Sequence, residues 1–508
     1  MDSHELRSVS STGEALTLDA SDAIAIIALS AAALIIGTIA IMLTVDSPGD
    51  GPAHGTIAYS WSQNPVIATY GVWLPGFMYM AGLCTMVLRN PLLGPRVFNL
   101  GLSMLTIAPF YVMVRKLYGS LQALLSTIAL VALPLRIGLG ASSLTEASFI
   151  FYVVAGLLCL MLSVEDDRVS ISALIAAMVF LVLAEMTRYE LWPLLPLIIC
   201  YVYARSRNLW VTASALIALA IFPISWTIGN YQNLGAFFPG IDIAAHPLEG
   251  GNSVTIAKAI AIDVRFAGRL IGWPLAVGAI AGLIGESYRA FYRKIATPIV
   301  SDRGAYVILV VTVWSMLFAG TLTRGAAMYT RYTLLSFTLA LPLAAVAYID
   351  VCGRYRHRIA LGIIGIAASL AFAYRAIYPL RATLTPIYIT RRQPTDIIAI
   401  VRWLRTSQYR NDAIVSTKLD WDSTYLPLYA PDFSSRFFVI SVWAPEEGTR
   451  GFVKSRRPAL LITARADGEQ IARLDHALGR AVEPMMHDPV FRSGYMEVYD
   501  ITNLTAHQ

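Results

Sequence analysis

The chain has 508 residues, of which 56% are hydrophobic and 14% charged, and its mean hydropathy is +0.60. This composition excludes the soluble globular classes and is typical of a polytopic membrane protein. The net charge of +6 comes from short basic clusters between apolar segments, so it does not indicate nucleic-acid binding. The four cysteines lie far apart in or beside apolar segments, which indicates neither a disulfide framework nor a zinc site.

The first apolar segment, residues 23–43, is long enough to cross a bilayer, which takes about 20 residues. It is too long for the core of a signal peptide, so we expect it to remain as the first transmembrane helix after a cytoplasmic tail, residues 1–21. No lysine or arginine occurs between Arg7 and Arg89. Because cytoplasmic loops are enriched in basic residues, the loop 45–96 is predicted to lie on the outer side.

Ten further crossings bring the predicted total to eleven. They are 97–114, 121–137, 147–164, 170–186, 191–204, 209–229, 270–287, 305–321, 332–349 and 359–378. With the N-terminus inside, the cytoplasmic connections are short and basic, as at Arg115-Lys116 and in 289–303. The apolar segment 72–88 contains Pro75 and two glycines, which favours a helix in the outer interface over a twelfth crossing.

The transmembrane domain is thus expected over residues 22–379, and the composition becomes mixed and polar from about residue 380. A helical pattern at 397–404 is followed by strand-like segments at 413–416, 436–441, 459–462 and 496–501. The sequence therefore predicts a small α/β domain over residues 380–508. On the predicted topology it is extracytoplasmic.

Ionisable residues gather in the segments predicted to face outward, where such groups are costly and tend to be functional. They are Asp46, Asp50, His54, Glu146, Arg188, Glu190, Arg324 and Arg331. Carboxylates and arginines together suit a substrate with a hydroxyl to deprotonate and a phosphate to hold, because an aspartate can act as a general base and arginine binds phosphate oxygens in a bidentate manner.

Structural roles remain open for each of these residues. Asp50 lies in Asp50-Gly-Pro, which is also turn chemistry, and Glu146 suits the first turn of a helix. Arg188 and Glu190 could form an ordinary interfacial ion pair, and Arg324 suits an anchor that extends its charge to the interface. A packing role is open for His54, and a turn role for Asp46.

The outer segments resemble motifs of the GT-C integral membrane glycosyltransferases, which include protein O-mannosyltransferases, aminoarabinose transferases of lipid A and rhizobial galacturonosyltransferases. The resemblance covers residues 21–378. The motifs are Asp50-Gly-Pro-Ala-His54-Gly-Thr-Ile-Ala-Tyr59, Tyr70-Gly-Val-Trp-Leu-Pro75-Gly-Phe-Met-Tyr79, Arg115-Lys-Leu-Tyr-Gly119, Leu144-Thr-Glu146-Ala-Ser-Phe149, Thr187-Arg-Tyr-Glu190 and Arg331-Tyr332. Gly51 stands where many members have a second acid.

The resemblance implies transfer of a sugar, with inversion, from a polyprenyl phosphate to a hydroxyl of a glycan, glycolipid or protein on the outer face of a bacterial-type inner membrane. Asp50 would be the catalytic base, and Arg331 and Arg188, with Arg324 behind them, would stabilise the phosphate. His54, Glu146 and Glu190 would contact substrate, and Asp46 would be secondary. No metal is required, although a divalent cation between Asp50 and Glu146 is an alternative.

Two other functions are left open by the sequence. A membrane glycan polymerase or ligase would use a diphosphate-linked donor, and would want more basic residues than the first outer loop offers. A secondary transporter would use Glu146, Arg188 and Glu190 to line a pathway, and that function predicts inverted repeats and broken midplane helices.

Overall fold

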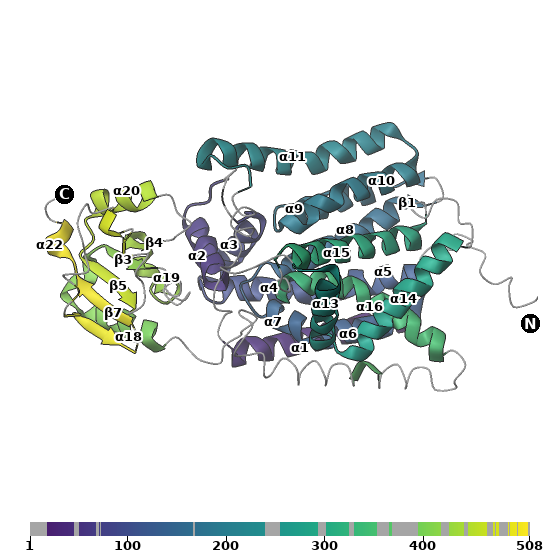
Figure 1. Ribbon diagram of the computed structural model, residues 1–508, viewed down its shortest axis with the longest axis horizontal. Helices are drawn as coiled ribbons and strands as arrows, with labels where there is room; N and C mark the ends of the chain where they lie inside the picture. The colour runs from purple at the N-terminus through teal and green to yellow at the C-terminus, as the bar shows by residue number, and fades with distance from the viewer. Residues whose placement is uncertain are drawn as a thin grey trace, which may run out of the picture.

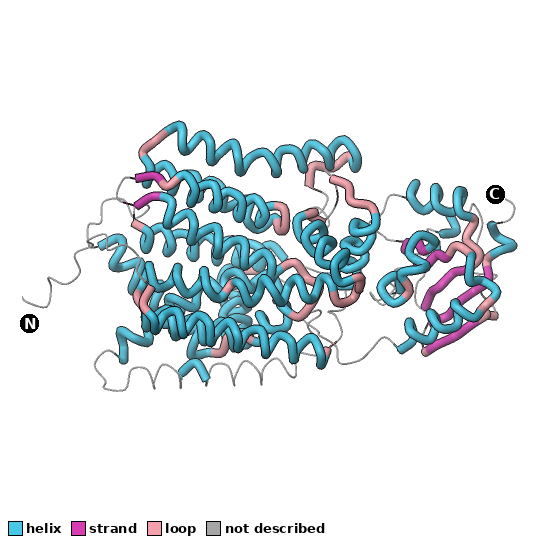
Figure 2. Tube along the Cα trace, turned by 180° about the vertical axis from the view of Figure 1, so that it is seen from behind, coloured by secondary structure: helices cyan, strands magenta, loops and turns pink. Residues whose placement is uncertain are grey.

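A helical bundle with a small mixed domain at one end makes up the computed structural model (Figure 1). Most helices run along the long axis of the molecule. Apart from one short pair, the strands are confined to the end domain, as the view from behind also shows (Figure 2). The structure describes residues 18–44, 50–67, 71, 73–165, 168–238, 254–292, 301–324, 330–352, 365–367, 395–417, 426–440, 446–464, 471–472, 474–476, 486, 488–494 and 496–505.

The elements of the bundle follow one another along the chain with short connections. They are α1 (Ala20–Leu43), α2 (Asp50–Gln63), α3 (Gly76–Leu88), α4 (Gly94–Leu105), α5 (Ile107–Tyr118), α6 (Ser120–Ala132), α7 (Pro134–Gly140), α8 (Glu146–Ser163), β1 (Val164–Glu165), β2 (Arg168–Val169), α9 (Ile171–Glu185), η2 (Tyr189–Leu194), α10 (Leu195–Ser206), α11 (Leu209–Leu234), α13 (Ile256–Leu270), α14 (Trp273–Tyr292), α15 (Asp302–Arg324), η4 (Thr330–Thr333) and α16 (Leu334–Cys352).

Six helices among the described residues are long and apolar enough to cross a bilayer, and each falls on a predicted span. They are Ala20–Leu43, Gly94–Tyr118, Glu146–Ser163, Leu209–Leu234, Asp302–Thr323 and Arg331–Val351. The predicted span 121–137 is bent by 59° between α6 and α7. The bend follows from Pro134, which has no N–H to continue the α6 ladder.

The predicted total of eleven spans stays a prediction. The apolar helices α9 and α10 are shorter than a full crossing, and α14 carries Glu286 and Arg289 near its end. Of the predicted span 359–378, only 365–367 lies among the described residues.

The helix α13 was not predicted. Its apolar positions are interrupted by Lys258, Asp263, Arg265 and Arg269, which lower the hydropathy of the segment below that of a span. It packs against α14 and α15, and Thr321 of α15 donates a hydrogen bond of 2.7 Å to Asp263.

The helices α2 and α3 form a packed pair at the end of the bundle that carries the mixed domain (Figure 1). Gly76 begins α3 and donates its N–H to Met186 O at 2.7 Å, where a Cβ would approach the same oxygen to 2.8 Å. Only glycine permits this approach, which holds α3 against the segment that leads into Arg188. The location of α3 in the outer interface stays a prediction.

The C-terminal elements alternate between helices and strands. They are α18 (Thr395–Thr406), η6 (Gln408–Asn411), β3 (Ile414–Thr417), α19 (Leu426–Tyr429), η8 (Pro431–Arg436), β4 (Phe437–Ile440), α20 (Glu446–Arg456), β5 (Leu460–Ala464), β6 (Phe491–Ser493), β7 (Met496–Asp500) and α22 (Thr502–Thr505). The strands form one sheet in the order β4-β3-β5-β7-β6, with β3 parallel to β4 and β5, and β7 antiparallel to β5 and β6.

Four of these strands and α18 lie where the sequence pattern predicts them, whereas the three-residue β6 was missed. Ile397 and Leu404 of α18 are buried against Leu460 of β5. The domain also contacts the bundle, because Leu428 lies against Gly55 of α2 and Leu92 packs against the same core cluster. The α2 helix therefore connects the C-terminal domain to the site described next.

Candidate active site

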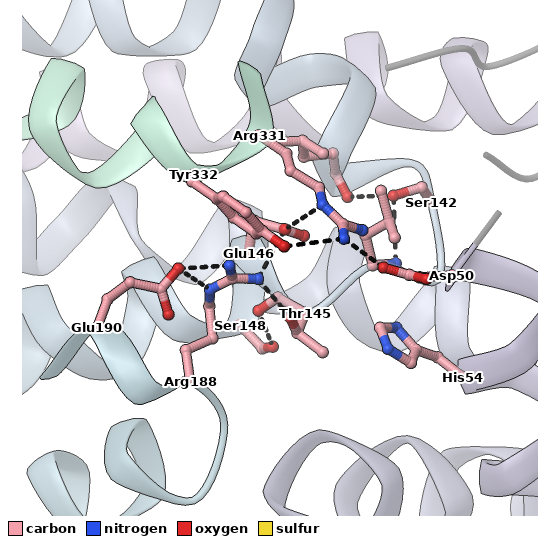
Figure 3. Close-up of polar contacts among 12 residues, drawn as sticks. Asp50, His54, Ser142, Thr145, Glu146, Ser148, Arg188, Glu190, Arg331 and Tyr332 are labelled. Atoms are coloured by element: carbon pink, nitrogen blue, oxygen red, sulfur yellow. Dashed lines mark hydrogen bonds and ion pairs between the residues drawn. The ribbon is translucent and has the colours of Figure 1, made fainter. Parts of the chain in front are cut away.

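Three carboxylates and two guanidiniums form one continuous chain of ionic contacts (Figure 3). Arg331 Nη2 donates to Asp50 Oδ2, and Arg331 Nε lies 3.5 Å from Glu146 Oε1. The same Glu146 oxygen accepts from Arg188 Nη1 at 2.6 Å. Arg188 Nε then donates to Glu190 Oε1 at 2.8 Å. The order of the chain is thus Asp50, Arg331, Glu146, Arg188 and Glu190.

Element ends bring these residues together from distant parts of the sequence. Asp50 is the first residue of α2, and Glu146 is the first residue of α8. Carboxylates are favoured at helix N-termini, where unpaired N–H groups carry partial positive charge. Arg188 directly precedes η2, and Arg331 lies in η4, which leads into α16. Each side chain can therefore reach the shared centre without interrupting an apolar helix.

The centre of this chain is buried. Glu146, Arg331 and Arg188 are 2%, 8% and 9% exposed. Buried charges are tolerated only when they are paired, and removing one partner leaves the other uncompensated. Burial alone would lower the pKa of Arg188, but the attraction of Glu190 and Glu146 raises it above its ordinary value. The guanidinium therefore stays charged.

Tyr332 adds an aromatic face to both arginines. The guanidinium carbons of Arg188 and Arg331 lie 4.8 Å and 5.1 Å from the centre of its ring. Its hydroxyl also accepts from Arg331 Nη2 at 3.2 Å. These contacts fix the two guanidiniums relative to each other, since cations are attracted to the face of an aromatic ring.

His54 lies one helical turn after Asp50 on α2 and is 3% exposed. Its ring packs edge-on against Trp73 and lies beside Phe77. His54 Nδ1 is 3.3 Å from Ser143 O, and because a carbonyl can only accept, Nδ1 carries the proton. Burial lowers the pKa of His54 to about 4, so the ring is neutral at pH 7.

Buried side chains also hold the loop that leads into Glu146. Arg96 Nε donates to Ala141 O at 2.7 Å, and Asn99 Nδ2 donates to the carbonyls of Ser142 and Leu144. With the His54 contact to Ser143 O, four successive carbonyls of residues 141–144 have a side-chain donor. The position of Glu146 is therefore set by α2 and α4 through this loop.

The space between Asp50 and Glu146 is occupied by the guanidinium of Arg331, which contacts both. A divalent cation bound by these two carboxylates would have to displace it. Among the described residues, no group of three or more His, Cys, Asp or Glu side chains is placed to hold a metal ion.

Six of the eight residues predicted from the sequence thus converge: Asp50, His54, Glu146, Arg188, Glu190 and Arg331. Asp46 lies outside the described residues, and for Arg324 the structure describes the backbone at the end of α15 only. Sequence reasoning gave no role to Thr145, which accepts from Arg188 Nη1 at 2.8 Å, or to Tyr332. It also missed Arg96 and Asn99, whose i, i+3 spacing within an apolar helix was the available signal.

Comparison with known proteins finds one family model and several solved structures that are similar to this chain. The model of the dolichyl-phosphate-mannose-protein mannosyltransferase family matches residues 73–226. ArnT from Cupriavidus metallidurans, solved bound to undecaprenyl phosphate, has 13% identity and a TM-score of 0.62. That likeness covers 95% of this chain and 98% of ArnT. No curated protein sequence matches the chain.

A second likeness is to the archaeal oligosaccharyltransferase AglB from Archaeoglobus fulgidus, solved in complex with an inhibitory peptide and a dolichol-phosphate. It has 11% identity and a TM-score of 0.56, and covers 89% of this chain and 71% of AglB. At these identities the likeness establishes the fold. The chain has the polytopic helical fold of the GT-C superfamily of membrane glycosyltransferases, which confirms the resemblance found in its motifs.

Proposed function

We propose that this protein is a glycosyltransferase that moves one sugar from a polyprenyl-phosphate-linked donor to a hydroxyl of a glycan, glycolipid or protein acceptor. On the predicted topology the reaction takes place on the outer face of the inner membrane, and the anomeric configuration inverts in one displacement. The observation that supports the proposal is the contact of Arg331 with both Asp50 and Glu146, because a carboxylate suited to act as a base and a guanidinium suited to bind phosphate lie together. The two likenesses, to structures that contain a polyprenyl phosphate, support the choice of donor.

The proposed roles follow from the chemistry of each group. Asp50 accepts the proton of the attacking hydroxyl, since an ionised carboxylate has only acceptor oxygens. Arg331 and Arg188 stabilise the charge that develops on the leaving phosphate, as preorganised cations do in a buried site. Glu146 and Glu190 hold these guanidiniums in place.

The contact between Asp50 and Arg331 has to open during this reaction. In an inverting displacement the attacking oxygen and the leaving phosphate lie on opposite sides of the anomeric carbon. Asp50 and Arg331 contact each other directly, so in this arrangement the two side chains cannot hold the hydroxyl and the phosphate on opposite sides of a sugar. We propose that the donor phosphate takes Arg331 from Asp50, which frees the carboxylate to act as a base. Arg331 remains near Glu146 through Nε.

The charge balance favours a monophosphate donor over a diphosphate donor. The chain of contacts contains three carboxylates and two guanidiniums, so it carries a net charge of −1 before the donor binds. A diphosphate would add a further negative charge to a site that has no spare cation among these five residues. Direct pairing of Arg331 with a phosphodiester also makes a metal ion unnecessary in this mechanism.

Mass spectrometry of surface glycans and glycolipids tests the proposal. A deletion strain is complemented with wild type, with Asp50→Asn or with Asp350→Asn, at matched protein levels. Asp350 is a control because it is half-exposed and pairs with Arg289, away from the site. We expect deletion to remove a glycan modification that wild type and Asp350→Asn restore and Asp50→Asn does not. Full restoration by Asp50→Asn would contradict the role of the base, and an unchanged glycan profile on deletion would contradict the enzyme class.

A further inference from the structure

Two hydrogen-bond acceptors in the site have no partner among the described residues. His54 Nε2 and Glu146 Oε2 are both buried and accept no hydrogen bond. Buried polar atoms in folded proteins are satisfied in the great majority of cases, and an unpaired one costs about 1–3 kcal/mol. Arg331 Nε, a donor 3.5 Å from Glu146 Oε1, is unpaired among the described residues as well. Two unpaired acceptors and an unpaired donor in one site therefore indicate a ligand that donates as well as accepts, as a hydroxyl does.

Both atoms are fixed as acceptors by their surroundings. The His54 Nδ1 proton is directed at Ser143 O, which leaves a lone pair on Nε2. The other carboxylate oxygen of Glu146 accepts from Arg188, and Arg331 Nε lies 3.5 Å from that same oxygen, so Oε2 is the oxygen left for a ligand. Figure 3 shows that His54 and Glu146 approach the pair formed by Asp50 and Arg331 from two different elements.

The position of these acceptors selects one part of the substrate. In the proposed reaction Arg331 binds the donor phosphate and Asp50 takes the acceptor hydroxyl, so the sugar ring lies between those two groups. His54 is one turn from Asp50 on α2, and Glu146 contacts Arg331. Both unpaired acceptors are thus next to the place of the sugar rather than that of the prenyl chain.

We infer that the donor sugar presents hydroxyl groups to His54 Nε2 and Glu146 Oε2 and carries no carboxylate, an inference that rests on the proposed function. Hydroxyl groups donate to both atoms and complete the buried site. A uronic acid would bring an ionised carboxylate, which cannot donate, into a site that already has a net charge of −1. The site therefore selects a neutral sugar against the corresponding uronic acid.

Competition binding with matched donors tests this selection. Purified wild-type protein in detergent is loaded with radiolabelled undecaprenyl phosphate, which is displaced by undecaprenyl-phosphate glucose or undecaprenyl-phosphate glucuronic acid. The two donors differ only at C6, and galactose and mannose pairs are treated in the same way. We expect the best-bound neutral donor to bind at least tenfold more tightly than its uronic acid. Equal or tighter binding of the uronic acid would overturn the inference.

Two variants connect the selection to the unpaired acceptor. Glu146→Gln removes one charge and replaces an acceptor oxygen, so it should reduce the tenfold selection to about twofold. Asp350→Asn also removes one negative charge, but Asp350 is half-exposed and pairs with Arg289 away from the site, so selection should stay near tenfold. Equal losses in the two variants would overturn the inference in favour of a general charge effect. If wild type binds neither undecaprenyl phosphate nor any donor, both the inference and the proposed function are contradicted. If wild type binds the donors without selection, only the inference is contradicted.

Discussion

The bundle contains a cluster of charged groups around Asp22 and another around Arg331, and the two differ in whether their hydrogen bonds are complete. Near the start of α1, Asp22 is 1% exposed and accepts from Tyr111 at 2.8 Å, while Arg115 Nη2 lies 2.7 Å from its other oxygen. The backbone N–H of Asp19 also donates to Asp22, so both carboxylate oxygens are satisfied. At Asp50 and Glu146 the ionic contacts are equally close, yet Glu146 Oε2 and His54 Nε2 have no partner.

This is the difference we expect between a structural ion pair and a site that binds a ligand. Both oxygens of the Asp22 carboxylate are paired within the protein, and the contact with Arg115 joins α1 to α5. This pairing offsets the cost of burying the charge. The cluster around Arg331 is complete in charge pairing but incomplete in hydrogen bonding. The unpaired atoms of the second cluster are the groups that the donor sugar and phosphate would satisfy under the proposed function.

Of these substitutions, those at Arg331 should reduce the rate of glycosyl transfer most. Arg331→Ala removes the proposed phosphate contact and leaves Asp50 without its partner, so we expect the transfer rate to fall about a thousandfold. Arg331→Lys keeps the charge but loses the forked geometry and should recover only part of the rate. The rate is measured as glycan modification in membrane vesicles that contain the endogenous donor and acceptor. A wild-type rate in Arg331→Ala would show that this cluster is structural like the other.

Replacing Asp22 should change stability and not transfer. Asp22→Asn leaves Arg115 without its charge partner, which we expect to cost about 3 kcal/mol and to lower the Tm in detergent by several degrees. The rate of transfer per folded molecule should stay within twofold of wild type. A large loss of rate at unchanged Tm would place Asp22 in the mechanism and remove the contrast between the clusters.

The pH dependence of stability should report the buried neutral ring of His54. Its pKa is about 4 in the folded protein and about 6.5 in the unfolded chain, so between these values only the unfolded chain binds the proton. Stability is therefore lost as the pH falls from 6.5 toward 4, by about 2 kcal/mol at pH 5. The drop in Tm from pH 7.5 to pH 5 should be smaller in His54→Gln than in wild type. Equal drops would indicate that His54 is accessible to protons in the folded state.

The sequence was sufficient for the parts of this structure that depend on local pattern. Long apolar segments predicted the six helices of the described residues that can cross a bilayer, and short strand-like segments predicted β3, β4, β5 and β7. Six residues that converge in the structure were predicted because ionisable groups at membrane depth are rare and tend to be functional. Their pairing was not predictable, since the contact of Asp50 with Arg331 joins residues 281 positions apart.

The missed features share a physical cause. Thr145 and Asn99 act through hydrogen bonds to residues 43 positions away in the sequence, and Tyr332 contacts Arg188 through its ring, so these roles arise only in the folded bundle. The spacing of Arg96 and Asn99 indicates a polar pair in an apolar helix, but it does not indicate which loop the pair holds. The amphipathic α13 was missed because its charged positions reduce the apolar content on which the prediction of spans depends.

The binding of undecaprenyl phosphate to Asp50→Asn tests whether the donor phosphate takes Arg331 from Asp50. The variant removes the competitor for the guanidinium, so it should bind undecaprenyl phosphate about tenfold more tightly than wild type, a change of about 1.4 kcal/mol, although transfer is lost. Glu190→Gln, which removes one charge without releasing Arg331, should tighten binding less than threefold. Unchanged or weaker binding by Asp50→Asn would contradict the exchange.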